Sequence, residues 1–369
     1  MLRHLLTRGS PQGPVITIGG KRYLNFSSND YLGLAGHPEL LKAAAEAGKR
    51  FGFGSGASRL LAGGSSIHER LETMTAAFKE TEAALIFNSG YACNTGIIPS
   101  LAPASCAIFS DELNHASIID GCRLSGARVL VFRHRNTDHL EELMRRERAG
   151  KKVVVTDSVF SMDGDIAPLK DLYSLCLRKS AVLYIDDAHG TGVLGNGKGA
   201  LAHFGLPPEP WIVQMGTFSK ALGSFGAFAA GDKDVIAWIT NTARSFMFST
   251  TLPAPVVAAS MKALGLLENG RGLVRKLWKN RKKLADGLRD IGCDEGPSET
   301  PIMTIVPGNL KETVALSAFL WGKGIYAPAI RPPTVREPRI RITVTAAHTE
   351  THIGRLIDTL EKYGRCQGK

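Results

Sequence analysis

The spacing of apolar residues is the first structural signal in this chain. Between residues 84 and 215, short runs of consecutive apolar side chains alternate with stretches whose apolar positions recur every three or four residues. The runs predict strands buried on both faces, and the recurring positions predict amphipathic helices. Strands are expected at 84–87, 106–109, 128–132, 153–157, 182–186 and 211–215, with helices such as 138–148 and 169–179 between them. This alternation predicts a mostly parallel sheet covered by helices.

The flanking segments follow other patterns. Short strands are expected at 15–18 and 22–26, an alanine-rich helix at 39–49, and another helix beginning at Ser65. Past residue 250, the pattern predicts helices at 255–269, 271–290, 312–323 and 349–363 and strands at 302–306 and 339–344. We therefore expect an N-terminal arm over 1–38, a large domain over 39–250 and a smaller α+β domain over 251–369.

Composition narrows the class of protein. The chain has 369 residues, of which 44% are hydrophobic and 21% charged, which suits a folded protein with a sizeable core. No apolar run is long enough for a membrane-spanning helix, and residues 1–14 lack the apolar core of a signal peptide. The 45 Lys and Arg residues exceed the 34 Asp and Glu residues, giving a net charge of +11. That excess is compatible with nucleic acid, phosphorylated small molecules or an acidic carrier protein.

The six cysteines are scattered, and no C-x-x-C pair occurs. This distribution argues against a structural zinc site and against a disulfide framework, and we expect no bound metal. A reducing, cytoplasmic location is the expectation that follows.

Two predicted strand ends carry reactive side chains. The strand at 182–186 ends in Asp186 and is followed by His189, whereas the strand at 211–215 is followed by Lys220 in a glycine-bracketed turn. A lysine at the end of a buried strand is stable when it is neutral or covalently committed, for example as a Schiff base with an aldehyde cofactor. Pyridoxal phosphate (PLP) also needs a carboxylate at its pyridine nitrogen and backbone amides for its phosphate, which the turn at 88–92 can supply.

Each of these features has an ordinary structural explanation when taken alone. A lysine in a Gly–Ser loop is usually a surface residue, and an aspartate at a strand end is most often a helix cap. The Asp-x-x-His and Thr-x-x-Lys patterns, on successive strands and in this order, favour the PLP site.

Six motifs resemble, in order, those of the α-oxoamine synthases, a branch of the fold-type I PLP-dependent enzymes. They are Asn-Phe-Ser-Ser-Asn-Asp-Tyr-Leu-Gly-Leu at 25–34, Gly-Ser-Gly-Ala-Ser-Arg at 54–59, Asn-His-Ala-Ser at 114–117, Phe-Ser-Met-Asp-Gly-Asp at 160–165, Asp-Asp-Ala-His-Gly-Thr-Gly at 186–192 and Thr-Phe-Ser-Lys at 217–220. The resemblance covers nearly the whole chain. It implies a fold-type I PLP-dependent transferase, with a mostly parallel central sheet and a smaller C-terminal α+β domain, and acyltransferase activity.

The resemblance also implies roles for individual residues. Lys220 would bind PLP covalently and move the proton at the substrate Cα, and Asp186 would hold the protonated pyridine nitrogen. His189 would hydrogen-bond the ring oxygen, and His115 would stack on the ring face. The other implied PLP contacts are Ser161, Thr217, Ser89, Gly90, Tyr91 and, from the second subunit of a homodimer, Thr250.

Within the family, the segments 330–335 and 339–348 most resemble the branch that condenses L-alanine with a pimeloyl thioester, carried by coenzyme A or an acyl carrier protein, in biotin biosynthesis. Arg341 is the expected ligand of the amino-acid carboxylate, because a guanidinium matches a carboxylate with two parallel hydrogen bonds. Arg331, Arg3 and Asn29 are also expected at the substrate. The alternative is another branch, of the glycine C-acetyltransferase or 5-aminolevulinate synthase type, which shares the cofactor residues.

Two unrelated functions fit the sequence less well. A nucleic-acid-binding module would use the basic stretch 271–289. The apolar residues of that stretch recur with helical spacing, which is typical of a helix with a solvated basic face, and no nucleic-acid-binding motif accompanies it. A dinucleotide-dependent dehydrogenase would need a third glycine where Arg59 stands, and an apolar strand before Gly54. The sequence favours neither.

Overall fold

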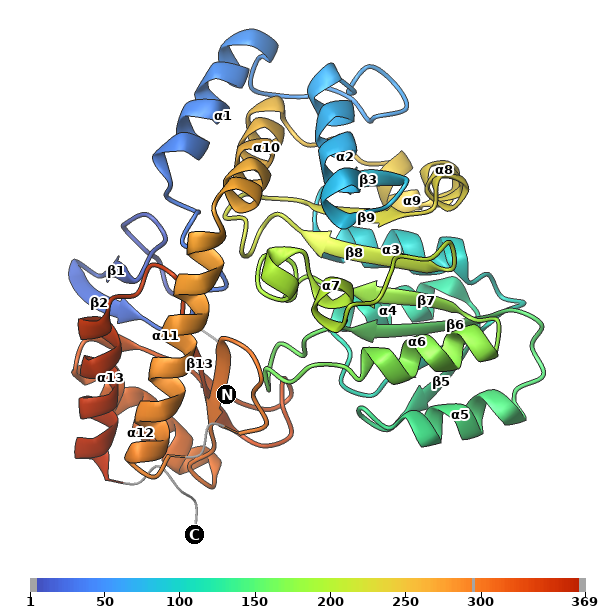
Figure 1. Ribbon diagram of the computed structural model, residues 1–369. Coiled ribbons are helices and arrows are strands. Elements are labelled where there is room, and N and C mark those ends of the chain that lie inside the picture. The colour runs from blue at the N-terminus through green and yellow to red at the C-terminus, as the bar shows by residue number, and fades with distance from the viewer. Residues whose placement is uncertain (1–4, 294–295, 365–369) are drawn as a thin grey trace. The chain divides into compact units, whose positions relative to one another are not determined.

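The computed structural model describes residues 5–293 and 296–364 (Figure 1). Contacts divide the chain into a large unit, Pro38–Phe160 with Ile166–Gly270, and a small unit, Met1–His37 with Ser161–Asp165 and Arg271–Lys369. This division differs from the expected one in three respects: the N-terminal arm joins the C-terminal residues, Ser161–Asp165 joins them too, and the large unit continues to Gly270. The arm joins them because its strand pairs in parallel with a strand near residue 325.

The large unit is built on a seven-stranded sheet in the order β3-β9-β8-β7-β6-β4-β5. The strands are β3 (Ala83–Phe87), β4 (Ala107–Asp111), β5 (Arg128–Phe132), β6 (Lys152–Asp157), β7 (Val182–Asp186), β8 (Ile212–Thr217) and β9 (Ala227–Gly231). Strand β9 runs antiparallel to both its neighbours, and the other pairings are parallel. The expected mostly parallel sheet is therefore confirmed.

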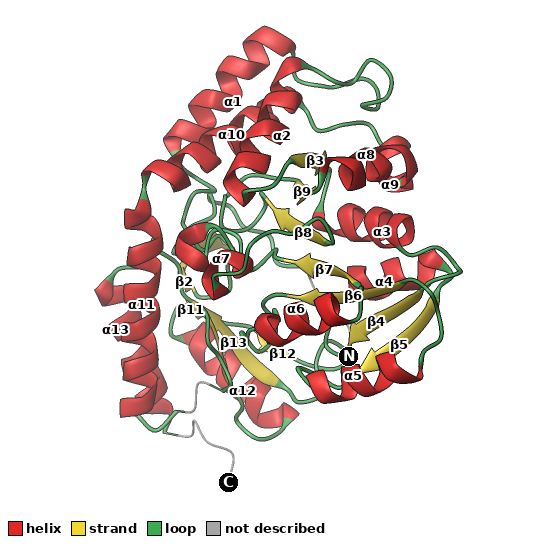
Figure 2. Ribbon diagram, turned by 45° about the vertical axis from the view of Figure 1, so that its right-hand side comes forward, coloured by secondary structure: helices red, strands yellow, loops and turns green. Residues whose placement is uncertain are grey.

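Helices cover both faces of this sheet (Figure 2). Helices α3 (Gly90–Leu101) and α4 (Ala116–Ser125) lie on one face, and α5 (Thr137–Arg146) and α6 (Leu169–Arg178) lie on the other. The remaining helices are α1 (Pro38–Phe51), α2 (Ser66–Lys79), η1 (Gly195–Gly197), α7 (Ala200–Phe204), α8 (Lys233–Thr242), α9 (Arg244–Met247) and α10 (Ala254–Asn269). Apolar side chains of α3, α4 and α8 form one buried core with those of the strands.

Four adjacent parallel strands of the large unit end in polar residues. Strands β4, β6, β7 and β8 end at Asp111, Asp157, Asp186 and Thr217, all of which are buried. In a parallel sheet these ends share one edge, where ligands bind. The register pairs Asp157 directly with Asp186, so the sheet itself brings two buried carboxylates together.

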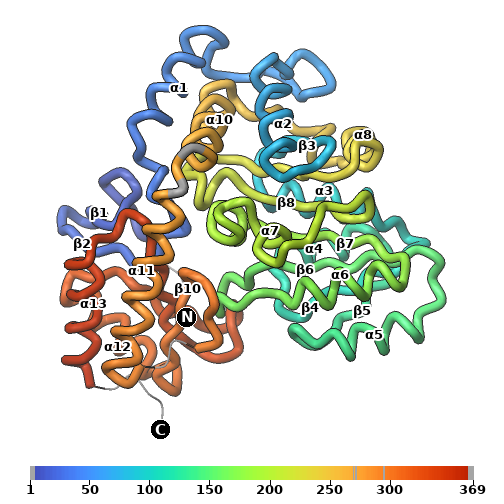
Figure 3. Tube along the Cα trace, in the orientation of Figure 1, coloured from blue at the N-terminus to red at the C-terminus, as the bar shows by residue number. Residues whose placement is uncertain are grey.

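The small unit contains two three-stranded sheets, β1-β2-β11 and β10-β13-β12. The strands are β1 (Val15–Ile18), β2 (Lys21–Asn25), β10 (Ile302–Ile305, labelled in Figure 3), β11 (Ile325–Tyr326), β12 (Ala329–Ile330) and β13 (Arg339–Thr343). The helices are α11 (Arg271–Asp290), α12 (Leu310–Gly322) and α13 (Glu350–Tyr363). Their apolar residues share a core with those of β10 and β13, among them Leu284, Leu316, Ile342 and Leu356.

The cysteines only partly follow expectation. Cys93, Cys106, Cys122 and Cys176 are buried free thiols, whereas Cys293 is disulfide-bonded. Among the described residues, no helix is long and apolar enough to cross a membrane, and no group of side chains could hold a metal ion.

Candidate active site

Asp186 is the most deeply placed of the predicted catalytic residues. It ends β7, and its carboxylate accepts hydrogen bonds from the Ala188 backbone N–H at 3.0 Å and from Asn94 Nδ2 at 2.7 Å. Burial raises the pKa of Asp186, and the positive charge of Lys220 opposes that shift. A buried carboxylate of this kind is stabilised by a nearby cation, which is the property that a protonated pyridine nitrogen offers.

Lys220 lies in a turn that follows β8. Backbone hydrogen bonds between the two ends of the turn close it. Phe218 donates its backbone N–H to Gly226, and Ser224 donates back to Phe218, at 3.0 and 2.8 Å. Gly226 has a φ of +98°, a conformation that favours glycine. The turn therefore holds the lysine in a defined place, close enough to Asp186 and His115 for its charge to act on the pKa of each.

The hydroxyl of Thr217 is used inside this turn. It donates to the Gly226 carbonyl at 2.7 Å and accepts the Ser219 backbone N–H at 3.1 Å. Ser219, which sequence reasoning did not single out, is exposed beside Lys220. Ser219 Oγ lies 2.6 Å from Thr217 Oγ1, so both hydroxyls take part in the hydrogen bonds of this turn. The predicted contact of Thr217 with PLP stays a prediction.

His115 caps the N-terminus of α4, and its backbone N–H donates to the Asp157 carboxylate at 2.7 Å. Burial raises the pKa of Asp157 well above its usual range, and the charge of Asp186 raises it further. The pKa of His115 is lowered by partial enclosure of the ring, with Asp186 opposing that shift and Lys220 reinforcing it. Asp157 was missed at the sequence level, although its place at the end of a predicted strand matches that of Asp186.

His189 is buried in the turn after β7. This turn is held by Asp187, whose carboxylate accepts hydrogen bonds from Ser158 Oγ at 2.7 Å and Thr191 Oγ1 at 2.9 Å and pairs with Lys79 Nζ at 2.9 Å. Lys79 and Asp187 were also missed, because a lysine at the end of a predicted helix looks like a surface residue.

The predicted phosphate site is the N-terminus of α3. Ser89 is the cap residue, and its hydroxyl accepts the Ala92 backbone N–H at 3.1 Å. No acidic side chain lies in the first turn, so the backbone N–H groups there suit an anion. Gly90 and Tyr91 begin the helix, and the Tyr91 hydroxyl donates to Asp120.

Thr250 is exposed, and its carbonyl accepts a hydrogen bond from the Asn88 side chain of the same chain at 2.7 Å. This bond holds the backbone of Thr250 against Asn88, the residue that precedes the Ser89 cap. The predicted contribution of Thr250 to the site of a second subunit stays a prediction.

Three of the predicted ligand-binding residues meet in the small unit. Arg341 on β13 is buried and donates from Nε to the Ser161 carbonyl at 2.5 Å and from Nη2 to Asn29 Oδ1 at 3.1 Å. Arg331 directly follows β12 and is partly buried. Arg3 lies outside the described residues.

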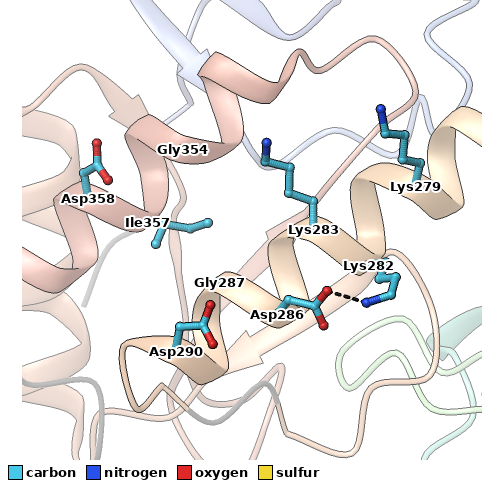
Figure 4. A pocket seen from close by; sticks show the side chains of 9 residues that line it. All are labelled: Lys279, Lys282, Lys283, Asp286, Gly287, Asp290, Gly354, Ile357 and Asp358. Atoms are coloured by element: carbon cyan, nitrogen blue, oxygen red, sulfur yellow. Dashed lines mark hydrogen bonds and ion pairs between the residues drawn. The ribbon is translucent and has the colours of Figure 1, made fainter.

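Acidic side chains pair with part of the basic surface of helix α11. Three lysines and three aspartates are among the residues that line a groove between α11 and α13 (Figure 4). Lys279 and Lys283 both pair with Glu350, and Lys282 pairs with Asp286. These ion pairs support the solvated-helix interpretation over a nucleic-acid interface.

Comparison with known proteins identifies the family. Residues 21–360 match the family of class I and II aminotransferases. The chain is 51% identical over 352 residues to a putative 8-amino-7-oxononanoate synthase of Thermodesulfovibrio yellowstonii, an alignment that covers 95% of this chain and 91% of the relative. It is 44% identical to the 8-amino-7-oxononanoate synthase of Thermoanaerobacter pseudethanolicus, with 98% and 93% covered. The chain belongs to the 8-amino-7-oxononanoate synthase family.

A solved structure of serine palmitoyltransferase with PLP superposes on this synthase with a TM-score of 0.94 at 30% identity, covering 98% of this chain and 92% of the other. The family, the acyltransferase class and PLP as cofactor, all expected from the sequence motifs, are thereby confirmed. The donor set of the large unit fits PLP, since it offers a buried carboxylate, a lysine amine and a helix N-terminus with no acidic residue in its first turn.

Proposed function

We propose that this synthase joins L-alanine to a pimeloyl thioester, with loss of carbon dioxide and release of the thiol, at the site built around Asp186 and Lys220. The observation that carries the proposal is the buried carboxylate of Asp186, held by two N–H donors at the edge of the parallel sheet. When bound, PLP accepts the electron pair left on the amino-acid Cα as a proton or carbon dioxide departs. The residues of the chain bind, orient and exchange protons around that carbon.

Asp186 would place its carboxylate against the ring nitrogen of PLP. Its two oxygens are already fixed by Asn94 and the Ala188 N–H, so the carboxylate does not have to reorganise when it accepts a further N–H. This interaction keeps the ring nitrogen protonated.

Lys220 attaches the cofactor and serves as acid and base at Cα. An amine removes a proton efficiently when it is neutral, and the turn from Thr217 to Gly226 fixes the backbone that carries this amine. His189 would hydrogen-bond the ring oxygen of PLP, and His115 would stack on the ring.

The remaining contacts secure the ends of the ligands. The N-terminus of α3, with Ser89, Gly90 and Tyr91, would hold the phosphate together with Thr250 of a second subunit, which makes the working enzyme a homodimer. The resemblance places Ser161 at the cofactor, and the carbonyl of Ser161 orients Arg341.

Arg341 would bind the amino-acid carboxylate. Its Nε and Nη2 are used for Ser161 and Asn29, which orient the guanidinium plane toward one direction of approach. Arg331 would bind the far carboxylate of the acyl chain, and Arg3 is proposed at the same end of the substrate.

Borohydride reduction followed by peptide mapping tests the attachment site. We expect the reduced adduct on the peptide that carries Lys220 and a loss of cofactor absorbance in Lys220→Ala. The exposed Lys233→Ala is the matched control and should keep both. An adduct on any other lysine would refute the assignment.

The acyl donor is decided by a direct competition. The enzyme is assayed with L-alanine and either pimeloyl-coenzyme A or a pimeloyl acyl carrier protein, and kcat/KM is compared. Glycine and serine in place of alanine, with acetyl, succinyl and palmitoyl thioesters, test the alternative branches; turnover of one of these pairs above the alanine reaction would overturn the proposed substrate. The four buried free thiols among the described residues favour a cytoplasmic location, whereas the disulfide of Cys293 counts against it.

A further inference from the structure

A chain of hydrogen bonds runs beneath the cofactor site. The Tyr184 hydroxyl donates to Asn94 Oδ1 at 2.6 Å, and Asn94 Nδ2 donates to Ser117 Oγ at 2.8 Å. Ser117 Oγ lies 2.7 Å from His115 Nδ1. The same Asn94 Nδ2 donates to Asp186 at 2.7 Å. One amide group therefore links the two residues that are expected to meet the cofactor ring at its nitrogen and on its face.

The direction of this chain can be read from the donors. The backbone N–H of Ser117 also points at His115 Nδ1, at 3.2 Å. A backbone N–H can only donate, so Nδ1 must be the acceptor and carries no proton. Because Nδ1 carries no proton, the Ser117 hydroxyl must donate to it, while its oxygen accepts the Asn94 N–H.

We propose that Asn94 is a positioning residue of this site, and that the chain from Tyr184 through Asn94 and Ser117 holds His115 as a neutral imidazole with its single proton on Nε2. The tautomer follows from the geometry of the chain alone; its catalytic meaning rests on the proposed function.

Burial supports the assignment. Asn94, Ser117 and Tyr184 are each at most 1% exposed, so water does not compete for the hydrogen bonds among these three residues, whereas His115 at the end of the chain is exposed. The charged groups around the ring are Asp186, Lys220 and Asp157, the last of which binds the His115 backbone. Enclosure of the ring lowers the pKa of His115, which agrees with a neutral imidazole at neutral pH.

The assignment has a chemical consequence. A neutral Nε2–H is a hydrogen-bond donor and cannot accept a proton from substrate at that atom. An imidazole without charge can also lie on a pyridinium ring without like-charge repulsion. His115 therefore orients a substrate oxygen or the ring, and proton transfer at Cα is left to Lys220.

Nitrogen NMR of histidine-labelled protein tests the tautomer, with and without PLP. We expect His115, assigned through His115→Gln, to show one protonated nitrogen, Nε2, and one unprotonated nitrogen, Nδ1, at neutral pH. His68 and His348 serve as internal references, because each accepts a backbone N–H at Nδ1, from Ser65 and Thr345. An Nδ1–H tautomer or an imidazolium at neutral pH would overturn the proposal.

Two variants test the chain. Ser117→Ala removes a donor that stabilises the unprotonated Nδ1, so the titration of His115 should move up by about 0.5–1 pH unit while His68 and His348 stay in place. Asn94→Leu removes one hydrogen bond to a charged carboxylate, so the PLP dissociation constant, measured by equilibrium titration, should rise roughly 10- to 100-fold. An unmoved His115 titration in the first variant, or an unchanged PLP affinity in a folded second variant, would refute the role of the chain.

Discussion

The buried ion pair between Lys79 and Asp187 gives the sharpest prediction about stability. Both side chains are 1% exposed, and Nζ lies 2.9 Å from Asp187 Oδ2 and 2.7 Å from the Lys198 carbonyl. Replacing Lys79 with methionine removes the cation and leaves the carboxylate buried. Breaking a pair of this kind costs about 3–5 kcal/mol.

The remaining partners of Asp187 set where in that range the effect falls. Ser158, Thr191 and the Ala200 N–H still donate to the carboxylate in Lys79→Met. We therefore expect a loss near the lower end, about 3 kcal/mol, in the free energy of unfolding of the large unit. Glycines 190 and 199 close on this carboxylate and leave no room for a Cβ, so the site cannot relax by moving Asp187 toward either of them.

Urea denaturation followed by circular dichroism measures the effect. Asp187→Leu and the double variant complete a mutant cycle, and the two single losses should exceed the double loss by at least about 0.5 kcal/mol. Lys282→Met, which breaks an exposed pair with Asp286, is the control and should change stability by less than about 1 kcal/mol. A loss of unfolding free energy below about 1 kcal/mol in Lys79→Met, or strict additivity in the cycle, would show that the pair does not stabilise the large unit as expected.

Three further perturbations test the small unit. Arg341→Lys keeps the charge but loses the planar fork, so KM for alanine should rise roughly tenfold or more with PLP affinity unchanged; an unchanged KM would contradict the carboxylate role. Burial lowers the pKa of His348 from 6.5 to about 3. The unfolded chain therefore takes up a proton at His348 first, and the free energy of unfolding falls as the pH drops from 6.5 towards 3. His348→Gln should reduce this fall in a curve of stability against pH. Leu284→Ala, in the core, should cost about 2–5 kcal/mol in urea denaturation, against less than about 0.5 kcal/mol for the exposed Leu177→Ala.

The local spacing of apolar residues predicted much of the fold. Strands β5 and β7 coincide with the expected ranges, and the long helix α11 does as well. Apolar side chains there are consecutive or regularly spaced because burial of the same faces is what stabilises those elements. Strand β9 was missed, since its Ala-Phe-Ala-Ala-Gly sequence has no β-branched residue and it forms only by pairing with β3 and β8.

The residues of the site likewise divide into those that the sequence predicted and those that it did not. Asp186, His189 and Lys220 were found because they stand at or just after predicted strand ends and in family motifs. Asn94 and Lys79 carried no comparable signal, since an asparagine or lysine on a helix is usually solvated. Their roles depend on partners 92 and 108 residues away in sequence.

The sequence by itself determined the family, the cofactor and the strand-end residues, because periodicity and short motifs are properties of neighbouring positions. Only the tertiary structure decided how the N-terminal arm joins the small unit, how Thr217 and Ser219 bond within the Lys220 turn, and how Asn94 connects Asp186 to His115. Those facts depend on which distant segments meet. A hydrogen bond across 92 residues is set by packing of α3 against β7, and no local pattern encodes it.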